Sequence, residues 1–197
     1  MTFRIELKRA LFATAILFGL FGVGYLLVFS ANGSVEVPEL FRITRERAAG
    51  ISRDIVVRTT NTVEKIGAMQ NVGEDRTRGV VLVREARRSN AGAYGSAFDL
   101  SEQLKVLAQT IAGISSARSQ RIASEAIATE LALVSEFIGY TQDVEILLNR
   151  LQAHFASGAD DVYAQDPLLQ KINARVRRIN DLNKEFEIQM RAFDRSL

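Results

Sequence analysis

The sequence contains no cysteine, no tryptophan and a single histidine, His154. Without cysteine the chain has no disulfide framework and no thiol chemistry. One histidine cannot supply a two-histidine zinc site, and a Ser/His/Asp triad would depend entirely on His154. The Glu-x-x-His pairs that hold di-iron centres in helical bundles are also missing. We therefore expect no catalytic residue, no metal site and no cofactor, and we interpret His154 as a histidine near a helix end.

Charged residues are absent from a long stretch near the N-terminus, residues 10–29. As a helix, these 20 residues would span about 30 Å, the thickness of the hydrocarbon core of a bilayer. The apolar part of a cleaved signal peptide is usually about 7 to 15 residues long. Cleavage after the small residues around Ala31 is the alternative. The length favours a retained transmembrane helix over residues 10–30, in which Ala15, Gly19 and Gly22 share a face suited to packing against another helix.

Basic residues flank only one side of this stretch closely. Arg4, Lys8 and Arg9 precede it, whereas residues 30–41 contain no Lys or Arg. The positive-inside rule therefore predicts a cytoplasmic N-terminus. The expected segments are a cytoplasmic tail (1–9), an anchor helix (10–30), a linker (31–38) and an extracytoplasmic helical bundle domain (39–197).

Neither sign of charge dominates the remaining chain. The sequence carries 25 Lys and Arg against 23 Asp and Glu, and removal of the first nine residues takes away three bases and one acid, leaving 22 of each. This balance gives no evidence for nucleic-acid binding. The acids concentrate in residues 97–168, which include Glu130 and Glu136, and the bases concentrate on either side. We expect this acidic middle to pack between two basic ends through exposed pairs.

A local basic patch lies in the first basic end, at Arg84, Arg87 and Arg88. We interpret it as a solvated helix face. Contact with an anionic lipid, a wall polymer or a partner is the alternative.

The first half of the domain shows helical periodicity with interruptions. Apolar residues recur at mostly helical intervals from Glu39 to about Asn71, although residues 54–63 are rich in β-branched residues that also suit a strand. "NVGED" at 71–75 predicts a turn.

A shorter helix is expected from Asp75 to Ser89, within which "GVVLV" at 79–83 could instead be a strand. "NAGAYGS" at 90–96 is expected to be a loop.

The second half is more regular. A helix face is predicted from Leu100 to Ile114, and residues 115–120 form either a connection or an exposed stretch of one long helix. The apolar stripe then continues through Ile127, Leu131, Val134, Ile138, Leu148, Leu151 and Phe155. Residues 156–166 are expected to be a loop, and Asp166 followed by Pro167 predicts the start of the last helix.

The last helix has the most regular pattern. Its apolar positions alternate steps of three and four: Leu169, Ile172, Val176, Ile179, Asn183, Phe186, Met190, Phe193 and Leu197. A polar Asn183 at one such position could fix the register of a two-stranded coiled coil. Leu168, Leu182 and Ile188 widen the apolar face, which favours packing within the chain's own bundle.

These features predict an all-α protein, with one N-terminal transmembrane helix followed by an antiparallel bundle of about four helices. We expect a non-enzymatic interaction or structural module of the cell envelope. It would be tethered to the lipid bilayer and act through helix-face contacts with other membrane or envelope proteins or with further copies of itself. The alternatives are a ligand-sensing bundle, for which the nine-residue tail supplies no output domain, and a coiled-coil assembly subunit. No feature identifies a small-molecule ligand.

Overall fold

The computed structural model describes residues 36–73, 75–157 and 167–197. All regular structure in these ranges is helical, which confirms the expected all-α class and the helical bundle. There are four long helices and one short 3-10 helix: α2 (Glu39–Met69), α3 (Arg76–Thr110), η3 (Ile111–Gly113), α4 (Ala117–Ser157) and α5 (Pro167–Asp194). The β-branched stretches at 54–63 and 79–83 belong to α2 and α3, so neither is a strand.

A glycine and a helix cap form the turn between α2 and α3, at the position that the sequence predicts. Gly73 has φ +59°, a left-handed conformation that glycine adopts without a steric penalty. Asp75 then caps α3, because its side chain accepts a hydrogen bond from the backbone N–H of Arg78 at 2.9 Å.

The expected loop at 90–96 is wrong, because these residues lie in the middle of α3. Their small side chains indicate a loop when read alone. In the fold, however, the segment is helical with one face inside the bundle, where Asn90 and Ala93 are 4% and 1% exposed. Burial of this face outweighs the low helix propensity of glycine and asparagine.

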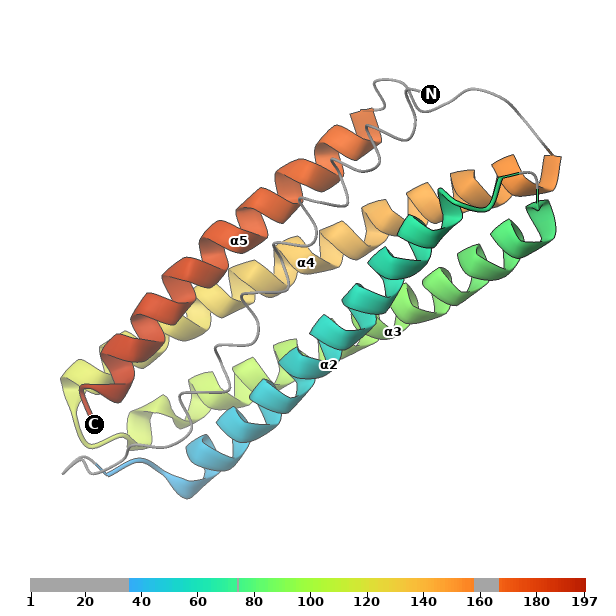
Figure 1. The fold of residues 1–197 in the computed structure, drawn as a ribbon. Helices are drawn as coiled ribbons and strands as arrows, with labels where there is room; N and C mark the ends of the chain where they lie inside the picture. The colour runs from blue at the N-terminus through green and yellow to red at the C-terminus, as the bar shows by residue number, and fades with distance from the viewer. Residues whose placement is uncertain (1–35, 74, 158–166) are drawn as a thin grey trace.

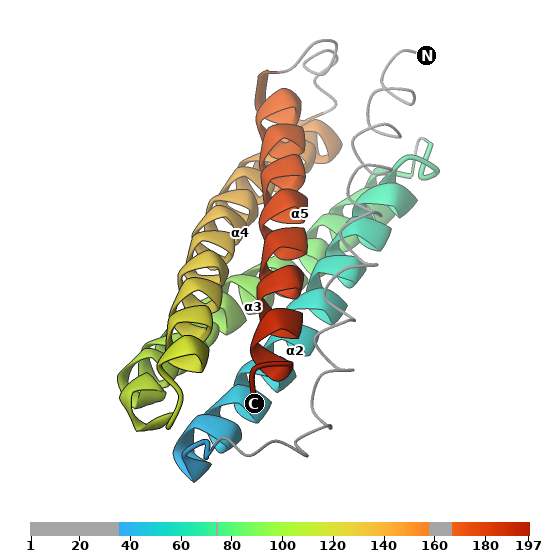
Figure 2. The ribbon, with the colours of Figure 1, turned by 90° about the vertical axis from the view of Figure 1, so that its left-hand side faces the viewer.

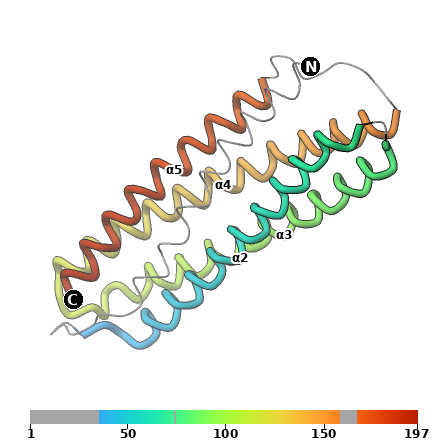
Figure 3. Tube along the Cα trace, in the orientation of Figure 1, coloured from blue at the N-terminus to red at the C-terminus, as the bar shows by residue number. Residues whose placement is uncertain are grey.

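The helices form two hairpins that lie side by side (Figure 1). α2 packs mainly on α3 and α5 mainly on α4, while contacts between α3 and α4 join the two pairs. The view turned by 90° shows α5 and α2 on one side, with α3 behind them (Figure 2). The start of α2, the α3–α4 connection and the C-terminus lie at the same end of the bundle (Figure 3).

Core positions on α3 and α4 follow a seven-residue repeat. On α3 they are Gly79, Val83, Ala86, Asn90, Ala93, Ala97, Leu100, Leu104 and Leu107. On α4 they include Ala126, Glu130, Leu133, Phe137, Tyr140, Val144, Leu147 and Leu151. On α3 this spacing presents one narrow face to the core, whereas α4 also buries flanking residues such as Ile127, Val134 and Leu148. The expected stripe on α4 is wrong at Leu131, which lies outside this repeat and is 40% exposed.

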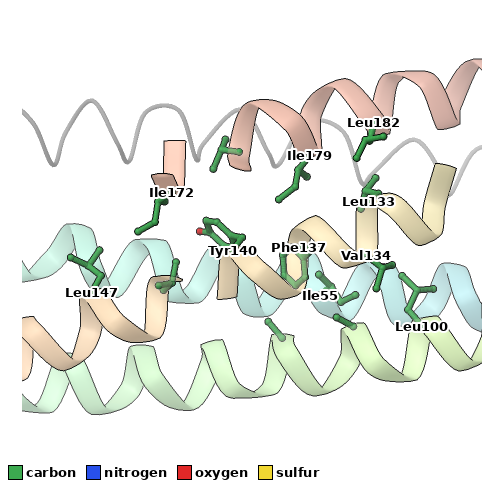
Figure 4. Close-up of a cluster of buried hydrophobic side chains, with 14 of the residues drawn as sticks. Ile55, Leu100, Leu133, Val134, Phe137, Tyr140, Leu147, Ile172, Ile179 and Leu182 are labelled. Atoms are coloured by element: carbon green, nitrogen blue, oxygen red, sulfur yellow. The ribbon is translucent and has the colours of Figure 1, made fainter. Parts of the chain in front are cut away.

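Large apolar side chains from α4 and α5 fill the centre of the molecule. Phe137 and Tyr140 of α4 lie close to Ile179 of α5, and Ile55 of α2 lies on their other side (Figure 4). Phe137 and Ile179 are 1% and 0% exposed. At the end that holds the C-terminus, the rings of Phe41 and Phe193 lie 5.7 Å apart and join α2 to α5.

The expected anchor helix lies outside the described residues, as do residues 1–35 as a whole. Among the helices that the structure describes, none combines the length and the apolar character needed to cross a bilayer. Residues 36–38, the end of the expected linker, are bound to the bundle. The backbone N–H of Glu36 donates to Ser115 Oγ at 3.1 Å, and the backbone N–H of Ser115 donates to the Glu36 carbonyl at 3.1 Å.

Candidate interaction surface

The regular stripe on the last helix lies in the core of its own chain. Leu169, Ile172, Val176, Ile179, Asn183 and Phe193 are each at most 6% exposed, while Phe186, Met190 and Leu197 are half-buried. Because the chain's own helices cover these side chains, α5 has no free apolar seam over this part of its length. Asn183 Nδ2 donates to Glu187 Oε1 at 3.0 Å, which satisfies that amide within α5.

An acidic side chain occupies one core position of α4. Glu130 is 5% exposed, and its Oε2 has no hydrogen-bond partner among the described residues. Burial disfavours the charged form and raises the pKa of Glu130 to about 7. The expectation that Glu130 belongs to an exposed acidic surface is therefore wrong. Only its place in the seven-residue repeat, which requires knowing the core face of α4, could have indicated burial.

The other acids of central α4 are neutralised by neighbouring helices. Asp143, with a side chain 3% exposed, pairs with Lys171 and Arg175 of α5, both at 2.7 Å. Arg175 also binds Glu136 at 2.9 Å. The pKa of Arg175 is raised by its hydrogen bond to Asp143.

On the opposite side of α4, Glu145 pairs with Arg87 of α3 at 2.7 Å. The acidic middle does therefore pair with both basic ends, as the charge pattern predicts. Arg87 of the basic patch is thus an internal pairing residue, because it also donates to Gln152 at 2.8 Å. Arg84 and Arg88 remain exposed on α3.

A buried hydrogen bond sets the register between α3 and α4. Asn90 Nδ2 donates to the carbonyl of Thr141 at 2.9 Å, and the two helices run antiparallel, since Arg87 meets Glu145. One turn away from this bond, Tyr94 of α3 and Ile138 of α4 therefore lie on neighbouring flanks.

Apolar side chains lie on the outside of this α3–α4 contact. Phe98 and Leu131 are 49% and 40% exposed. The Tyr94 and Phe98 rings meet edge to face at 5.0 Å. Tyr94, Phe98, Leu131 and Ile138 are called the α3/α4 surface below.

Charge is missing from the middle of this surface. Residues 89–98 contain no charged residue, and the only charged residues in 126–149 are the four acids that are buried or paired. The exposed residues of α4 in this range are uncharged: Ala128, Leu131, Ala132, Ser135, Gln142, Ile146 and Asn149. Such a surface can be covered by a protein without leaving an unpaired charge in the contact.

This surface was not predicted from the sequence, because residues 90–96 were expected to be a loop and Leu131 was expected to lie in the core. The one signal that could have found it is the run of ten residues without charge at 89–98, in a chain with 24% charged residues.

His154 is half-buried near the end of α4, and its ring lies 5.3 Å from that of Phe155. No group of three or more His, Asp or Glu side chains suited to a metal ion occurs in residues 36–73, 75–157 and 167–197. The expected membrane-packing residues Ala15, Gly19 and Gly22 lie outside these ranges.

Comparison of the chain with known protein families, curated proteins and solved structures gave no match.

Proposed function

We propose that this protein is a membrane-tethered, non-enzymatic interaction module of the cell envelope, in which the α3/α4 surface contacts other proteins. Residues 10–30 are the anchor, and residues 34–197 lie outside the cytoplasm. The observation that carries the proposal is the exposed apolar α3/α4 surface, whose neighbouring acids on central α4 are all buried or paired. The anchor and the topology rest on the sequence alone.

The composition of the α3/α4 surface supports a role in binding. Aromatic and large aliphatic side chains are enriched at the centres of protein interfaces, where charged residues are depleted. Phe98 and Tyr94 supply aromatic area on α3, and Leu131 supplies aliphatic area on α4. Internal pairing of Glu136, Asp143 and Glu145 leaves the partner few charges to desolvate.

The attachment of the linker determines which end of the bundle the anchor would hold. Glu36 is hydrogen-bonded to Ser115 in the α3–α4 connection, and the partly buried Val37 packs against the core. An anchor ending at residue 30 would leave five residues, 31–35, to join this end. Five extended residues span at most about 17 Å, so this end of the bundle lies close to the membrane.

Location is tested with a reporter that is active only outside the cytoplasm, fused after Leu197. The expected result is an active reporter in the membrane fraction at full-length mass. A soluble product that begins near Ser34 would overturn the anchor. An inactive reporter would overturn the topology.

Binding is tested by crosslinking of the full-length chain in intact membranes, followed by partner identification. Phe98→Asp with Leu131→Asp should abolish the crosslinked partner, because two buried carboxylates would be unpaired. Val57→Asp is the matched control, since Val57 is 57% exposed on α2. Equal recovery with both variants would exclude the α3/α4 surface.

A further inference from the structure

The outer side of α3 carries a second seven-residue pattern, opposite its core positions. Its members are exposed and follow steps of three and four: Val81, Arg84, Arg88, Ala91, Gly95, Phe98, Glu102 and Lys105, with the exposed Asp99 beside Phe98. Such a pattern is typical of a helix face that packs along another helix. No described helix of this chain covers it, since every member is exposed.

The charges on this outer face are ordered by sign. Arg84 and Arg88 lie on one side of the small residues Ala91 and Gly95, and the acids Asp99 and Glu102 lie on the other side, with Lys105 one turn farther out. Arg84 and Asp99 form no ion pair or hydrogen bond within the described part of the chain. Glu102 meets Lys105 only at 3.9 Å, with both side chains well exposed. These charges are therefore available to a partner.

The glycine at the centre of the face has no role in packing within the chain. A Cβ atom at Gly95 would meet nothing within 4 Å, yet glycine in a helix interior lowers stability by roughly 0.5–1 kcal/mol relative to alanine. By contrast, a Cβ at Gly79 would overlap the Phe155 ring, and one at Gly92 would overlap the Arg58 side chain. The Phe155 ring explains Gly79, whereas the flexible Arg58 side chain could move away from a Cβ at Gly92. Nothing within the chain explains Gly95, and close approach of another backbone would explain it.

We propose that α3 binds α3 of a second copy of this chain, antiparallel, about a two-fold axis that passes between Ala91 and Gly95. In this register Ala91 lies opposite Gly95 of the second copy, and Arg84 lies opposite Glu102. Arg88 lies beside Phe98 and Asp99. Every contact occurs twice, as a two-fold symmetric interface requires.

The order of charges along α3 favours an antiparallel second copy of α3 as the partner of this face. An antiparallel copy brings bases to acids at both ends of the contact, whereas a parallel copy would place Arg84 beside its own equivalent. The outer face of α2 would not give such a pairing of opposite charges. Gly50 also has open space around it, but a two-fold axis at Gly50 would bring Arg47 against Arg53 and Glu46 against Asp54, which are pairs of like charge.

Antiparallel pairing also constrains how two anchored copies sit on a membrane. The two-fold axis is perpendicular to α3, so both anchors can enter one bilayer when the paired bundles lie along its surface. This arrangement rests on the proposed function, because it assumes that the chain is anchored and that the protein acts through contacts between helix faces. The register between the two α3 helices does not depend on the anchor.

Introduced thiols test the register, because the chain has no cysteine of its own. Full-length chains carrying Arg84→Cys and Glu102→Cys, with different tags, are mixed in detergent, reconstituted together and oxidised. A disulfide between the two variants is expected. Either variant alone should give none, because the two copies of position 84 would lie about 27 Å apart along the helices. Disulfides within single-variant samples would indicate a parallel pair and overturn the proposal, as would no disulfide in any sample.

Charge exchange tests the same contact without cysteine. Arg84→Glu with Arg88→Glu should weaken self-association at least about tenfold, and Asp99→Lys with Glu102→Lys should do the same. A mixture of the two charge variants should associate as tightly as the original chain, because each base again faces an acid. Arg47→Glu with Arg53→Glu on α2 is the matched control and should have no effect. Failure of the mixture to associate would overturn the proposal even if both variants fold.

Two separate measurements keep this result distinct from the proposed function. The reporter after Leu197 and crosslinks to other proteins test the tethered module, whereas disulfides between differently tagged copies test the dimer. A correctly located protein that captures another protein but forms no self-disulfide would refute the dimer alone. A self-disulfide formed by a protein found in the cytoplasm would refute the tether alone.

Discussion

The two hairpins of the bundle share a seven-residue core repeat but fill it differently. On α3 the core positions from Gly79 to Ala97 hold glycine, alanine, asparagine and a single valine. On α4 the core positions from Leu133 to Leu151 hold leucine, valine, phenylalanine and tyrosine. The α2/α3 hairpin therefore depends on close approach of two backbones, whereas the α4/α5 hairpin depends on large apolar side chains.

Hydroxyl side chains can be buried between the closely packed helices α2 and α3 because they form hydrogen bonds within their own helix. Thr59 and Thr62 of α2 are 4% and 1% exposed. Each donates to the backbone carbonyl four residues earlier, at 2.7 and 2.9 Å. Ser96 Oγ of α3 lies 2.6 Å from Asp54 Oδ2 and 3.0 Å from the Gly92 carbonyl, so its one proton is donated to either acceptor. A polar side chain that bonds to its own helix can face a neighbouring helix without an unsatisfied hydroxyl.

The largest difference between the hairpins should appear on truncation of a core side chain. Phe137→Ala should lower the free energy of unfolding by about 3 to 5 kcal/mol, because it removes a ring from a filled core. Val83→Ala on α3, at an equally buried position, should lower it by about 2 kcal/mol, since only two methyl groups are lost. Urea denaturation of the full-length chain followed by circular dichroism measures both. Equal losses would show that α3 contributes as much apolar burial as α4.

The second-largest difference should be a dependence of stability on pH that arises in the α4/α5 hairpin, from Glu130 of α4. Burial raises the pKa of Glu130 to about 7 in the folded protein, from an ordinary value of 4.5. Between these values the folded state holds a proton that the unfolded state has lost, so stability falls as pH rises from about 4.5 to 7. The loss should be roughly 3 kcal/mol.

Removal of this carboxyl supplies the control. Glu130→Gln should flatten the urea-denaturation midpoint between pH 5 and 7.5, whereas Glu85→Gln on α3 should leave the slope in place. Burial also raises the pKa of Asp194, which acts with the same sign at lower pH. A Glu130→Gln variant with an unchanged slope would show that Glu130 is charged in the fold.

Removal of an ion pair should also destabilise the α4/α5 hairpin more than the α2/α3 hairpin, but the difference in free energy should be smaller. Arg175→Ala leaves the buried Asp143 with Lys171 alone, so a loss of about 2 to 3 kcal/mol is expected. Arg58→Ala removes a pair in which both side chains are 43% exposed, and exposed pairs contribute at most about 1 kcal/mol. Denaturation in low and high salt checks this, since only the exposed pair should be weakened by salt. A salt-dependent loss for Arg175→Ala would contradict the burial of its partner.

The smallest effect, and one of opposite sign, is expected at Gly95. Gly95→Ala should raise the free energy of unfolding of the isolated copy by about 0.5 to 1 kcal/mol, because the helix gains propensity without a clash. Gly79→Ala should lower it by about 1 to 3 kcal/mol, because the new methyl overlaps Phe155. Melting curves at low protein concentration measure both. A destabilising Gly95→Ala would show that the intrachain fold needs the glycine after all.

Prediction of helices and core positions from the sequence was correct where the apolar side chains are large. The α5 helix starts at Pro167 as predicted, and its seam residues from Leu169 to Phe193 follow the repeat read from the sequence. It failed at residues 90–96 because alanine and glycine give a weak hydrophobic pattern whether they are buried or exposed. It failed at Glu130 for the opposite reason, since a charged residue is read as exposed by default. The α3/α4 surface was missed for both reasons together.

The sequence by itself determined the all-α class, the turn at residues 71–75, the start of α5 and the pairing of an acidic middle with basic ends. These follow from local backbone chemistry, side-chain spacing and net charge, which need no knowledge of neighbours. Only the tertiary structure decided that residues 90–96 are helical, that Glu130 is buried and that Phe98 and Leu131 are exposed. Those outcomes depend on which face of α3 and α4 meets another helix. The antiparallel register, held by Asn90 and Thr141, sets that face.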